Sequence, residues 1–243
     1  MLSDDDDAAL YDLLNPWDPE HSPGDRFYHE LVMAAGSVLD VGCGTGTMLA
    51  YAREHGHQGY LVGLDPDRAA LDRARRRTDV EWARGKAADM QWKADFDLVV
   101  MTGHAFQCLR TDQELRASLA AIGVAMRDDG RFAFETRHPQ ARAWEGWNPS
   151  GETSVVDAAG RTLRVWHEVE SVVGDLVTFT GTTAEPDGTV LRVDRTSLRF
   201  LDGDELDAFL ADAGLEIEAQ YGDWQREPIA VTSKEIITIA RRG

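Results

Sequence analysis

Three glycines lie close together in the segment VLDVGCGTG, residues 38–46. The apolar run before Gly42 predicts a buried strand, and the residues after Gly46 predict a helix, so the glycines lie in the turn between them. Because glycine has no Cβ, a turn built from Gly42, Gly44 and Gly46 lets a ligand approach the backbone closely. A tight turn that binds nothing also favours glycine, so the accompanying residues must decide between a binding loop and a purely structural turn.

The acidic residue of this segment, Asp40, favours a positively charged ligand. The glycine spacing is G-x-G-x-G, whereas a dinucleotide-binding loop has the spacing G-x-G-x-x-G. A carboxylate beside the loop would repel a pyrophosphate and attract an ammonium group. The loop therefore predicts that the ligand is a small molecule with a positively charged group.

Two more acids follow the next two predicted strands. The Asp65 carboxylate can accept hydrogen bonds from both hydroxyls of a ribose, or it can cap the next helix. Asp89 could accept from an adenine amino group while the Met90 N–H donates to a ring nitrogen, or it could be an ordinary loop acid. Ligands of open α/β sheets bind beyond the carboxyl ends of the strands, so acids at three successive strand ends predict one site.

Alternating strands and helices position these residues. The predicted strands are 37–42, 59–65, 80–85, 96–103 and 130–136, and the predicted helices between them are 45–56, 66–77 and 111–127. This alternation predicts an α/β, doubly wound fold with a mostly parallel sheet covered by helices on both faces. A helix over 202–214 and strands over 215–222 and 233–241 continue it.

Two segments depart from this rhythm. Residues 150–201 contain segments of two-residue periodicity joined by turn dipeptides, which predict an inserted antiparallel sheet. Residues 1–24 carry four consecutive aspartates and several prolines, which predict a flexible or loosely ordered segment. Residues 25–243 are then one domain that includes the insert, with Asp25 as the N-cap of its first helix.

The composition limits the classes of partner that this chain is expected to bind. The formal net charge is −18, which disfavours nucleic acid, and no apolar run approaches the roughly 18 residues of a membrane span. The N-terminus lacks the features of a signal peptide, so we expect a cytoplasmic protein. Two cysteines without metal-ligand spacing predict reduced thiols, and we expect no metal.

The motifs resemble those of class I S-adenosylmethionine-dependent methyltransferases of the small-molecule type. The resemblance covers residues 26–140 and 201–241 and is carried by VLDVGCGTG, GLDPDRAALDRAR, GKAADM, FDLVVMTGHAFQCL and GRFAFET. It implies a seven-stranded sheet whose last strand is antiparallel, with the insert as a lid.

The resemblance also implies the cofactor S-adenosyl-L-methionine, with S-adenosyl-L-homocysteine as the product. Asp40 and the glycine backbone would hold the methionine portion, Asp65 the ribose, and Asp89 with Met90 the adenine. Tyr28, in a helix that folds over the cofactor in this family, would contact the methionine end or pack in the core. The predicted cofactor-binding residues are Tyr28, Asp40, Gly42, Gly44, Gly46, Asp65, Pro66, Asp89, Met90 and Thr102.

Catalysis would then consist mainly of aligning a nucleophile for in-line displacement, with a general base only where the nucleophile begins protonated. His104, after the fourth strand, is the first candidate for this base; packing against the cofactor is its alternative role. Glu135 is the second catalytic candidate and His138 a further one, although either could instead brace the loop through Arg137.

The acceptor is predicted to be a small molecule held between the strand ends and the insert. Trp144 and Trp147 could line its pocket or pack a hinge. Alternatives are a non-catalytic S-adenosylmethionine-binding or regulatory protein and an NAD-dependent oxidoreductase. Exposed strand edges of the insert could pair in a homodimer.

Overall fold

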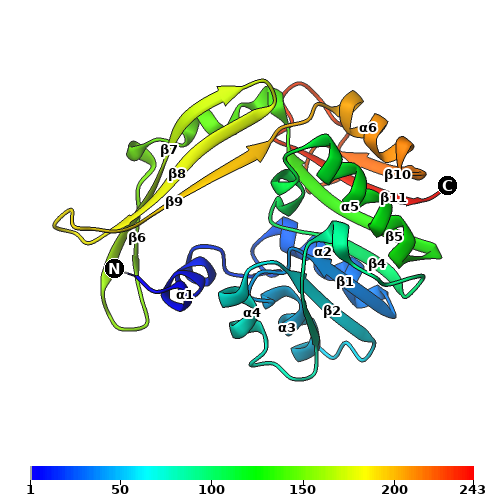
Figure 1. Ribbon diagram of the computed structural model, residues 1–243, viewed down its shortest axis with the longest axis horizontal. Coiled ribbons are helices and arrows are strands. Elements are labelled where there is room, and N and C mark those ends of the chain that lie inside the picture. Colours follow the sequence, from blue (N-terminus) through cyan, green and yellow to red (C-terminus); the bar gives the residue numbers. More distant parts are fainter. Residues whose placement is uncertain (1) are drawn as a thin grey trace.

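The computed structural model describes residues 2–243 and contains two separate sheets (Figure 1). The larger sheet has seven strands in the order β10-β11-β5-β4-β1-β2-β3. Their bounds are β1 Ser37–Val41, β2 Tyr60–Asp65, β3 Glu81–Arg84, β4 Phe96–Met101, β5 Met126–Arg137, β10 Leu215–Tyr221 and β11 Glu235–Arg242. β11 pairs antiparallel with both of its neighbours, and β1 to β5 pair in parallel. The predicted fold class is confirmed.

Helices cover both faces of this sheet. The helices outside the N-terminal segment are α2 Pro23–Ala34, α3 Thr47–Glu54, α4 Arg68–Ala74, α5 Asp112–Ala125 and α6 Gly203–Asp212. On one face α2 and α3 bury residues such as Phe27, Val32 and Leu49 against the strands. On the other face α5 and α6 bury Leu119 and Leu210. The two apolar layers hold the strands rigidly, so their carboxyl ends form a fixed platform.

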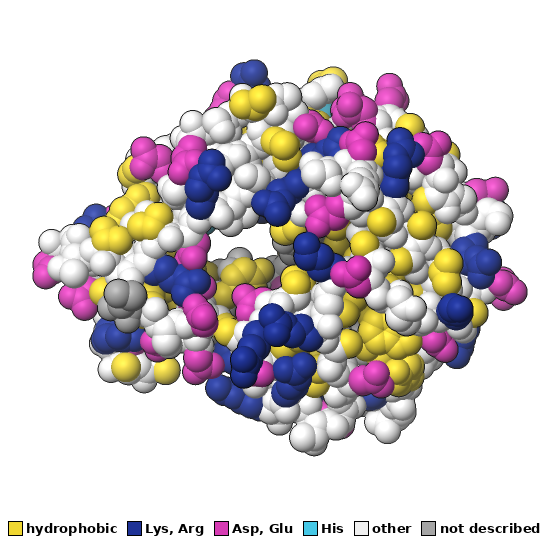
Figure 2. Space-filling view, viewed as in Figure 1, with side chains coloured by type: hydrophobic (Ala, Val, Ile, Leu, Met, Phe, Trp, Pro, Cys, Tyr) yellow, Lys and Arg dark blue, Asp and Glu magenta, His cyan; other side chains and the backbone are white. Residues whose placement is uncertain are grey.

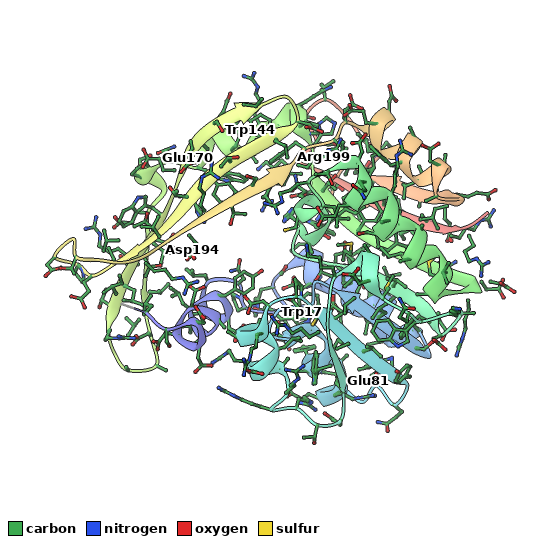
Figure 3. The ribbon with its side chains drawn as sticks, viewed as in Figure 1. Trp17, Glu81, Trp144, Glu170, Asp194 and Arg199 are labelled. Atoms are coloured by element: carbon green, nitrogen blue, oxygen red, sulfur yellow. The ribbon has the colours of Figure 1, made fainter. Side chains whose placement is uncertain are left out.

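The insert is a four-stranded antiparallel sheet, as predicted, and we call it the lid. Its strands, in spatial order, are β6 Thr153–Val156, β7 Thr162–Val173, β8 Leu176–Ala184 and β9 Val190–Arg199. Figure 3 shows Trp144 and Arg199 near the base of the lid, where it leaves the larger sheet. Short 3₁₀ turns occur at η1 Ala87–Asp89, η2 Ala105–Cys108, η3 Pro139–Ala141, η4 Ala143–Gly146 and η5 Pro149–Gly151.

The N-terminal segment differs from its sequence prediction, because residues 4–14 form a helix, α1 (Asp4–Leu14). Ser3 is its N-cap and forms a capping box with Asp6. The four aspartates occupy the first turn, where carboxylates interact favourably with the helix dipole, and the prolines follow the helix rather than interrupt it. The acidic run is therefore a helix start. In α2, similarly, Ser22 rather than Asp25 is the N-cap.

Helix α1 lies between the lid and the larger sheet (Figure 1). On the lid side, Leu2 and Leu10 pack against Leu163 of β7. On the other side, Asp12 accepts a hydrogen bond from Arg73 of α4 at 3.1 Å and another from the Thr45 hydroxyl in the glycine loop. The lid, α1 and the sheet therefore enclose a common space.

Candidate active site

We call the glycine turn, residues 42–46, the cofactor loop after its predicted role, and its three glycines have two different uses. A Cβ on Gly46 would stand 2.2 Å from the Trp82 ring, and one on Gly42 would stand 2.8 Å from Ala105 Cβ. These two glycines are needed for packing. A Cβ on Gly44 would meet no atom within 4 Å, so at Gly44 the loop borders open space.

Asp40 lies inside β1 with 1% of its surface exposed. Among residues 2–243, its Oδ1 has no hydrogen-bond partner. Burial, and to a lesser extent the charges of Asp65 and Glu135, raises the pKa of Asp40 to about 8. A buried carboxyl without a partner is costly, and a bound ammonium group would satisfy it. This orphaned oxygen fits the amino group of the predicted donor.

Asp65 ends β2 and organises the cofactor loop. Its Oδ2 accepts from the Gly44 N–H at 2.8 Å, and its Oδ1 accepts from the Asp67 N–H at 2.7 Å. Asp67, not Asp65, is the N-cap of α4, so the helix-cap alternative for Asp65 is wrong. Burial raises the pKa of Asp65. A carboxylate has about four lone-pair positions, so Asp65 can still accept from ligand hydroxyls.

The predicted adenine residues lie farther along the same edge. Asp89 ends η1, and together with Met90 it lines a cavity of about 310 Å³ beside the ends of β2 and β3. The Met90 N–H donates to the Ala87 carbonyl at 3.3 Å, a long hydrogen bond. These residues border a ligand-sized space, but the structure does not bring Asp89 into contact with Asp40 or Asp65.

Pro66 and Thr102 flank the cofactor loop on neighbouring strands. Pro66 is exposed, and its carbonyl accepts from Arg84 Nε at 3.2 Å. Thr102 directly follows β4, is partly exposed, and accepts from the Ala105 N–H at 3.2 Å through its carbonyl. Both therefore lie where the sequence predicts, and neither side chain has a polar contact that marks a ligand.

A buried hydrogen-bond network joins the catalytic candidates. Glu135, 2% exposed in β5, accepts from the Tyr28 hydroxyl of α2 and from the His104 N–H at 2.7 Å. His104 Nε2 lies 3.0 Å from Glu235 Oε2 of β11. The structure thus brings together three predicted residues from three elements, and it adds Glu235, which the sequence analysis missed.

Burial sets the protonation of this network. It raises the pKa of Tyr28 well above its ordinary value, and the adjacent Glu135 raises it further, so the hydroxyl remains a hydrogen-bond donor. Burial also raises the pKa of Glu135, although His104 and Tyr28 oppose that rise. The Tyr28 hydroxyl is engaged with Glu135, which supports a role in fixing Glu135 rather than contact with the methionine portion.

His104 has a strained backbone. Its φ is +62°, in the left-handed region that costs an ordinary residue about 1–2 kcal/mol, and it follows Gly103 with φ +64°. Such strain clusters at functional sites. The two hydrogen bonds of His104, through its N–H to Glu135 and its ring to Glu235, hold this conformation.

Two further residues were missed or undervalued in the sequence. The Tyr11 hydroxyl, from α1, lies 3.8 Å from the position that a Cβ on Gly103 would occupy. Arg137, at the end of β5, donates to Gln107 Oε1 at 3.1 Å.

Sequence signals for the residues that were missed differ. The Ser3 capping box could have revealed the helix that carries Tyr11. The contact of Glu235 with His104 crosses 131 residues of sequence, and no local pattern encodes it.

The aromatic residues at the base of the lid form a packed hinge. The Trp144 ring centroid lies 4.6 Å from that of Phe200, and the Trp147 centroid lies 4.6 Å from that of Phe179. These contacts favour the hinge alternative for both tryptophans. His138 caps η3 by accepting from the Gln140 N–H, so it serves the same hinge.

The space-filling view shows a central hollow between the lid and the larger sheet (Figure 2). Among residues 2–243 there is no group of three or more His, Cys, Asp or Glu side chains arranged to hold a metal ion. In the same described part of the chain, none of the helices has both the length and the apolar character that crossing a membrane requires.

Comparisons with known proteins agree with this geometry. Residues 38–130 match a family model described as a methyltransferase domain. The chain is 30% identical over 192 residues to dTDP-3-amino-3,4,6-trideoxy-alpha-D-glucopyranose N,N-dimethyltransferase of Streptomyces venezuelae, covering 77% of this chain and 78% of the relative. It is 24% identical over 217 residues to the cypemycin N-terminal methyltransferase of a Streptomyces species, covering 85% of this chain and 83% of the relative.

A solved structure shares the fold over the full length of both chains. The CcbJ methyltransferase of Streptomyces caelestis superposes with a TM-score of 0.77 at 18% sequence identity, and 100% of each chain is covered. The lid is therefore part of a shared architecture.

Proposed function

The chain belongs to the class I S-adenosylmethionine-dependent methyltransferases, and on that basis we propose that it methylates an amine nitrogen of a small molecule. Methyl transfer from S-adenosylmethionine to a small-molecule acceptor is the activity of this family, and neither the oxidoreductase nor the non-catalytic alternative is supported. The acceptor atom and the residue roles are our proposal.

The observation that carries the choice of nitrogen is the group of acids on the acceptor side. Glu135 and Glu235 both contact His104 beyond the end of β4, and carboxylates there attract a protonated amine. Two of the relatives are named for methylation of nitrogen, one as an N,N-dimethyltransferase of an amino sugar nucleotide and one as an N-terminal methyltransferase.

The donor would be held by the residues around the cofactor loop. Asp40 would receive the amino group, the open side of Gly44 the methionine portion, and Asp65 the ribose hydroxyls. Asp89 and Met90, which line the cavity of about 310 Å³, would border the adenine. When bound, S-adenosylmethionine supplies a methyl group activated by its sulfonium.

His104 would remove the proton that an ammonium acceptor must lose before its nitrogen lone pair can attack. Glu235 accepts from the Nε2–H tautomer, which leaves the lone pair on Nδ1 to take the proton. Glu135 would hold the His104 backbone in place, and Tyr28 would hold Glu135. Alignment of the acceptor within the hollow would supply most of the acceleration.

The test is turnover with two amine acceptors, a dTDP-amino sugar and a peptide with a free N-terminus. Release of S-adenosylhomocysteine together with the mass of an added methyl group on the amine supports the proposal. Transfer only to a matched hydroxyl acceptor contradicts it.

The role of His104 is tested by comparing its variant with that of His55, an exposed histidine that directly follows α3. We expect His104→Ala to lower kcat about 100-fold with S-adenosylhomocysteine affinity unchanged, and His55→Gln to change neither. Equal losses of affinity and turnover in His104→Ala would show that the residue supports the fold of the site and is not its base.

A further inference from the structure

Arg137 is the last residue of β5, on the acceptor side of the site. It stands directly opposite Glu235 of β11 in the strand register, and Glu135 lies two residues before it. Side chains two residues apart on a strand share a face, and directly opposite residues have Cβ atoms about 5 Å apart. One face of the sheet edge therefore presents two carboxylates and one guanidinium.

The guanidinium does not pair with either carboxylate. Glu235 contacts His104 Nε2 at 3.0 Å, and Glu135 accepts from Tyr28 and from the His104 N–H. Among residues 2–243, no carboxylate oxygen lies within 4.0 Å of the Arg137 guanidinium.

A neutral residue holds the guanidinium instead. Arg137 Nη1 donates to Gln107 Oε1 at 3.1 Å, and Gln107, 1% exposed, is itself fixed by donating to the Arg199 carbonyl at 2.9 Å. The guanidinium carbon lies 5.4 Å from the centroid of the Trp147 ring. Gln107 and Trp147 orient the group while leaving its other N–H donors without a carboxylate.

The electrostatic consequence separates Arg137 from the arginines of the lid. Burial lowers the pKa of Arg137, whereas hydrogen bonds to carboxylates raise the pKa of Arg161 and Arg164. The charges of Glu235 and Glu135 oppose this lowering, but a partly buried cation without a direct ion pair is unfavourable, and an anionic ligand would relieve it.

We propose that Arg137 binds an anionic group, a carboxylate or a phosphate, carried by the methyl acceptor. This inference rests on the proposed amine methylation, because the adjacent acids would receive the amine end of the same molecule. A guanidinium presents two parallel N–H donors that match either anion. The acceptor class is then an amine with a negatively charged group.

The position of Arg137 assigns the anion to the acceptor rather than to the carboxylate of the donor. In the sheet, β4 lies between β5 and β1, and the cofactor loop follows β1. Arg137 also lies toward the lid, because its guanidinium carbon is 5.4 Å from the centroid of the Trp147 ring, which packs against Phe179 of β8. The donor carboxylate is the competing source, and the experiment separates the two.

The experiment measures anion binding by calorimetry in wild type, Arg137→Met, Arg137→Lys and Arg195→Met. Inorganic pyrophosphate and malonate are the phosphate and carboxylate probes, titrated with and without saturating S-adenosylhomocysteine. Arg195 is the matched control, because it is an exposed lid arginine paired with Glu170 at 2.7 Å. Melting temperatures report whether each variant folds.

We expect at least one probe to bind wild type and to bind Arg137→Met about tenfold more weakly. Arg137→Lys, which keeps the charge without the fork, should fall between them, and Arg195→Met should match wild type. If Arg137→Met does not fold, the weaker binding of Arg137→Lys decides. S-adenosylhomocysteine should bind all four proteins equally.

Equal anion binding in wild type and both Arg137 variants overturns the proposal, as does the absence of anion binding to wild type. A tenfold loss of S-adenosylhomocysteine affinity in Arg137→Met assigns the residue to the donor and also overturns it. Failure of the broader proposal looks different: wild type and variants would then transfer no methyl group to amines, although the anion titrations would still depend on Arg137.

Discussion

The carboxylates of the two sides of the hollow are arranged in opposite ways. At the strand ends, Asp40 and Glu135 are almost completely buried, and within residues 2–243 neither contacts a lysine or an arginine. In the contacts of α1 with the lid, Asp4 and Asp7 are paired with Arg192 at 2.9 and 3.6 Å. These two strand-end acids have no cationic partner, whereas the two α1 acids already have one.

This difference separates a binding surface, the strand ends, from a movable cover, by which we mean α1 together with the lid. Unpaired buried acids are unfavourable until a cationic ligand arrives, so the strand ends gain most from binding. Exposed ion pairs contribute only about 0.2–1 kcal/mol each and weaken in salt. Figure 3 shows Asp194 and Glu170 on the lid strands, where side chains are paired with arginines rather than buried. We therefore expect the strand ends to be rigid and the cover to open.

Crowding the rigid side should have the strongest effect on stability. Gly46→Ala would drive a methyl group into Trp82, at 2.2 Å, at a residue with φ +76°. Overpacking and left-handed strain together predict a loss of about 2–5 kcal/mol in the free energy of unfolding. Denaturant titration measures it, and a loss below 1 kcal/mol would mean that the loop is not rigid.

Gly44→Ala is the matched control, because its new methyl group meets no atom within 4 Å. It should cost only the left-handed strain of about 1–2 kcal/mol, yet lower S-adenosylhomocysteine affinity more than tenfold, since the methyl group enters the proposed donor space. Unchanged affinity would place the donor elsewhere.

The next effect concerns ligand binding at the end of β2. Asp65→Asn keeps the shape but removes the charge that would accept the ribose hydroxyls, so donor affinity should fall about 10- to 100-fold. Asp67→Asn keeps a residue that can cap α4 and should leave affinity within about twofold. Titration with S-adenosylhomocysteine measures both, and equal losses would reduce Asp65 to a loop support.

The parts of the site also differ in how far the sequence could predict their positions. Gly42, Asp40 and Asp65 lie within or beside strands that local periodicity predicts and that alternate with helices, so their meeting at one edge of a parallel sheet could be predicted. The proximity of Glu235 to His104 depends on the antiparallel pairing of β11 with β5, which no local pattern sets. Helix α1 was missed because four like charges suggested disorder, whereas their position in the first turn stabilises a helix.

A subtler test asks whether the unpaired acid responds to the ligand. The pKa of Asp40 is about 8 in the folded protein and about 4 in an unfolded chain. Between these values the folded state holds the proton and the unfolded state does not, so this residue lowers the free energy of unfolding as pH rises from about 4 to 8.

A bound ammonium favours the charged carboxylate, so S-adenosylhomocysteine binding at pH 7 should release close to one proton from Asp40. Calorimetry in two buffers of different ionisation enthalpy measures the release, and Asp40→Asn should abolish it. Binding without proton release in wild type would contradict a direct interaction between Asp40 and the amino group.

The smallest expected effect lies on the cover. Arg192→Met removes the pairs of Arg192 with Asp4, Asp7 and Asp194, while Arg73 of α4 still holds Asp12. Because exposed pairs are weak, hydrogen exchange of the α1 amides should quicken only about two- to fivefold, with donor affinity unchanged. Arg195→Met, whose partner Glu170 belongs to the lid itself, should leave the exchange of α1 as it is.

Added salt should quicken α1 exchange in wild type more than in Arg192→Met, since the variant has fewer pairs to screen. If neither salt nor the Arg192 substitution changes the exchange rate of the α1 amides, the apolar contact of Leu2 and Leu10 with Leu163 holds the cover closed. The two sides of the hollow would then be equally fixed.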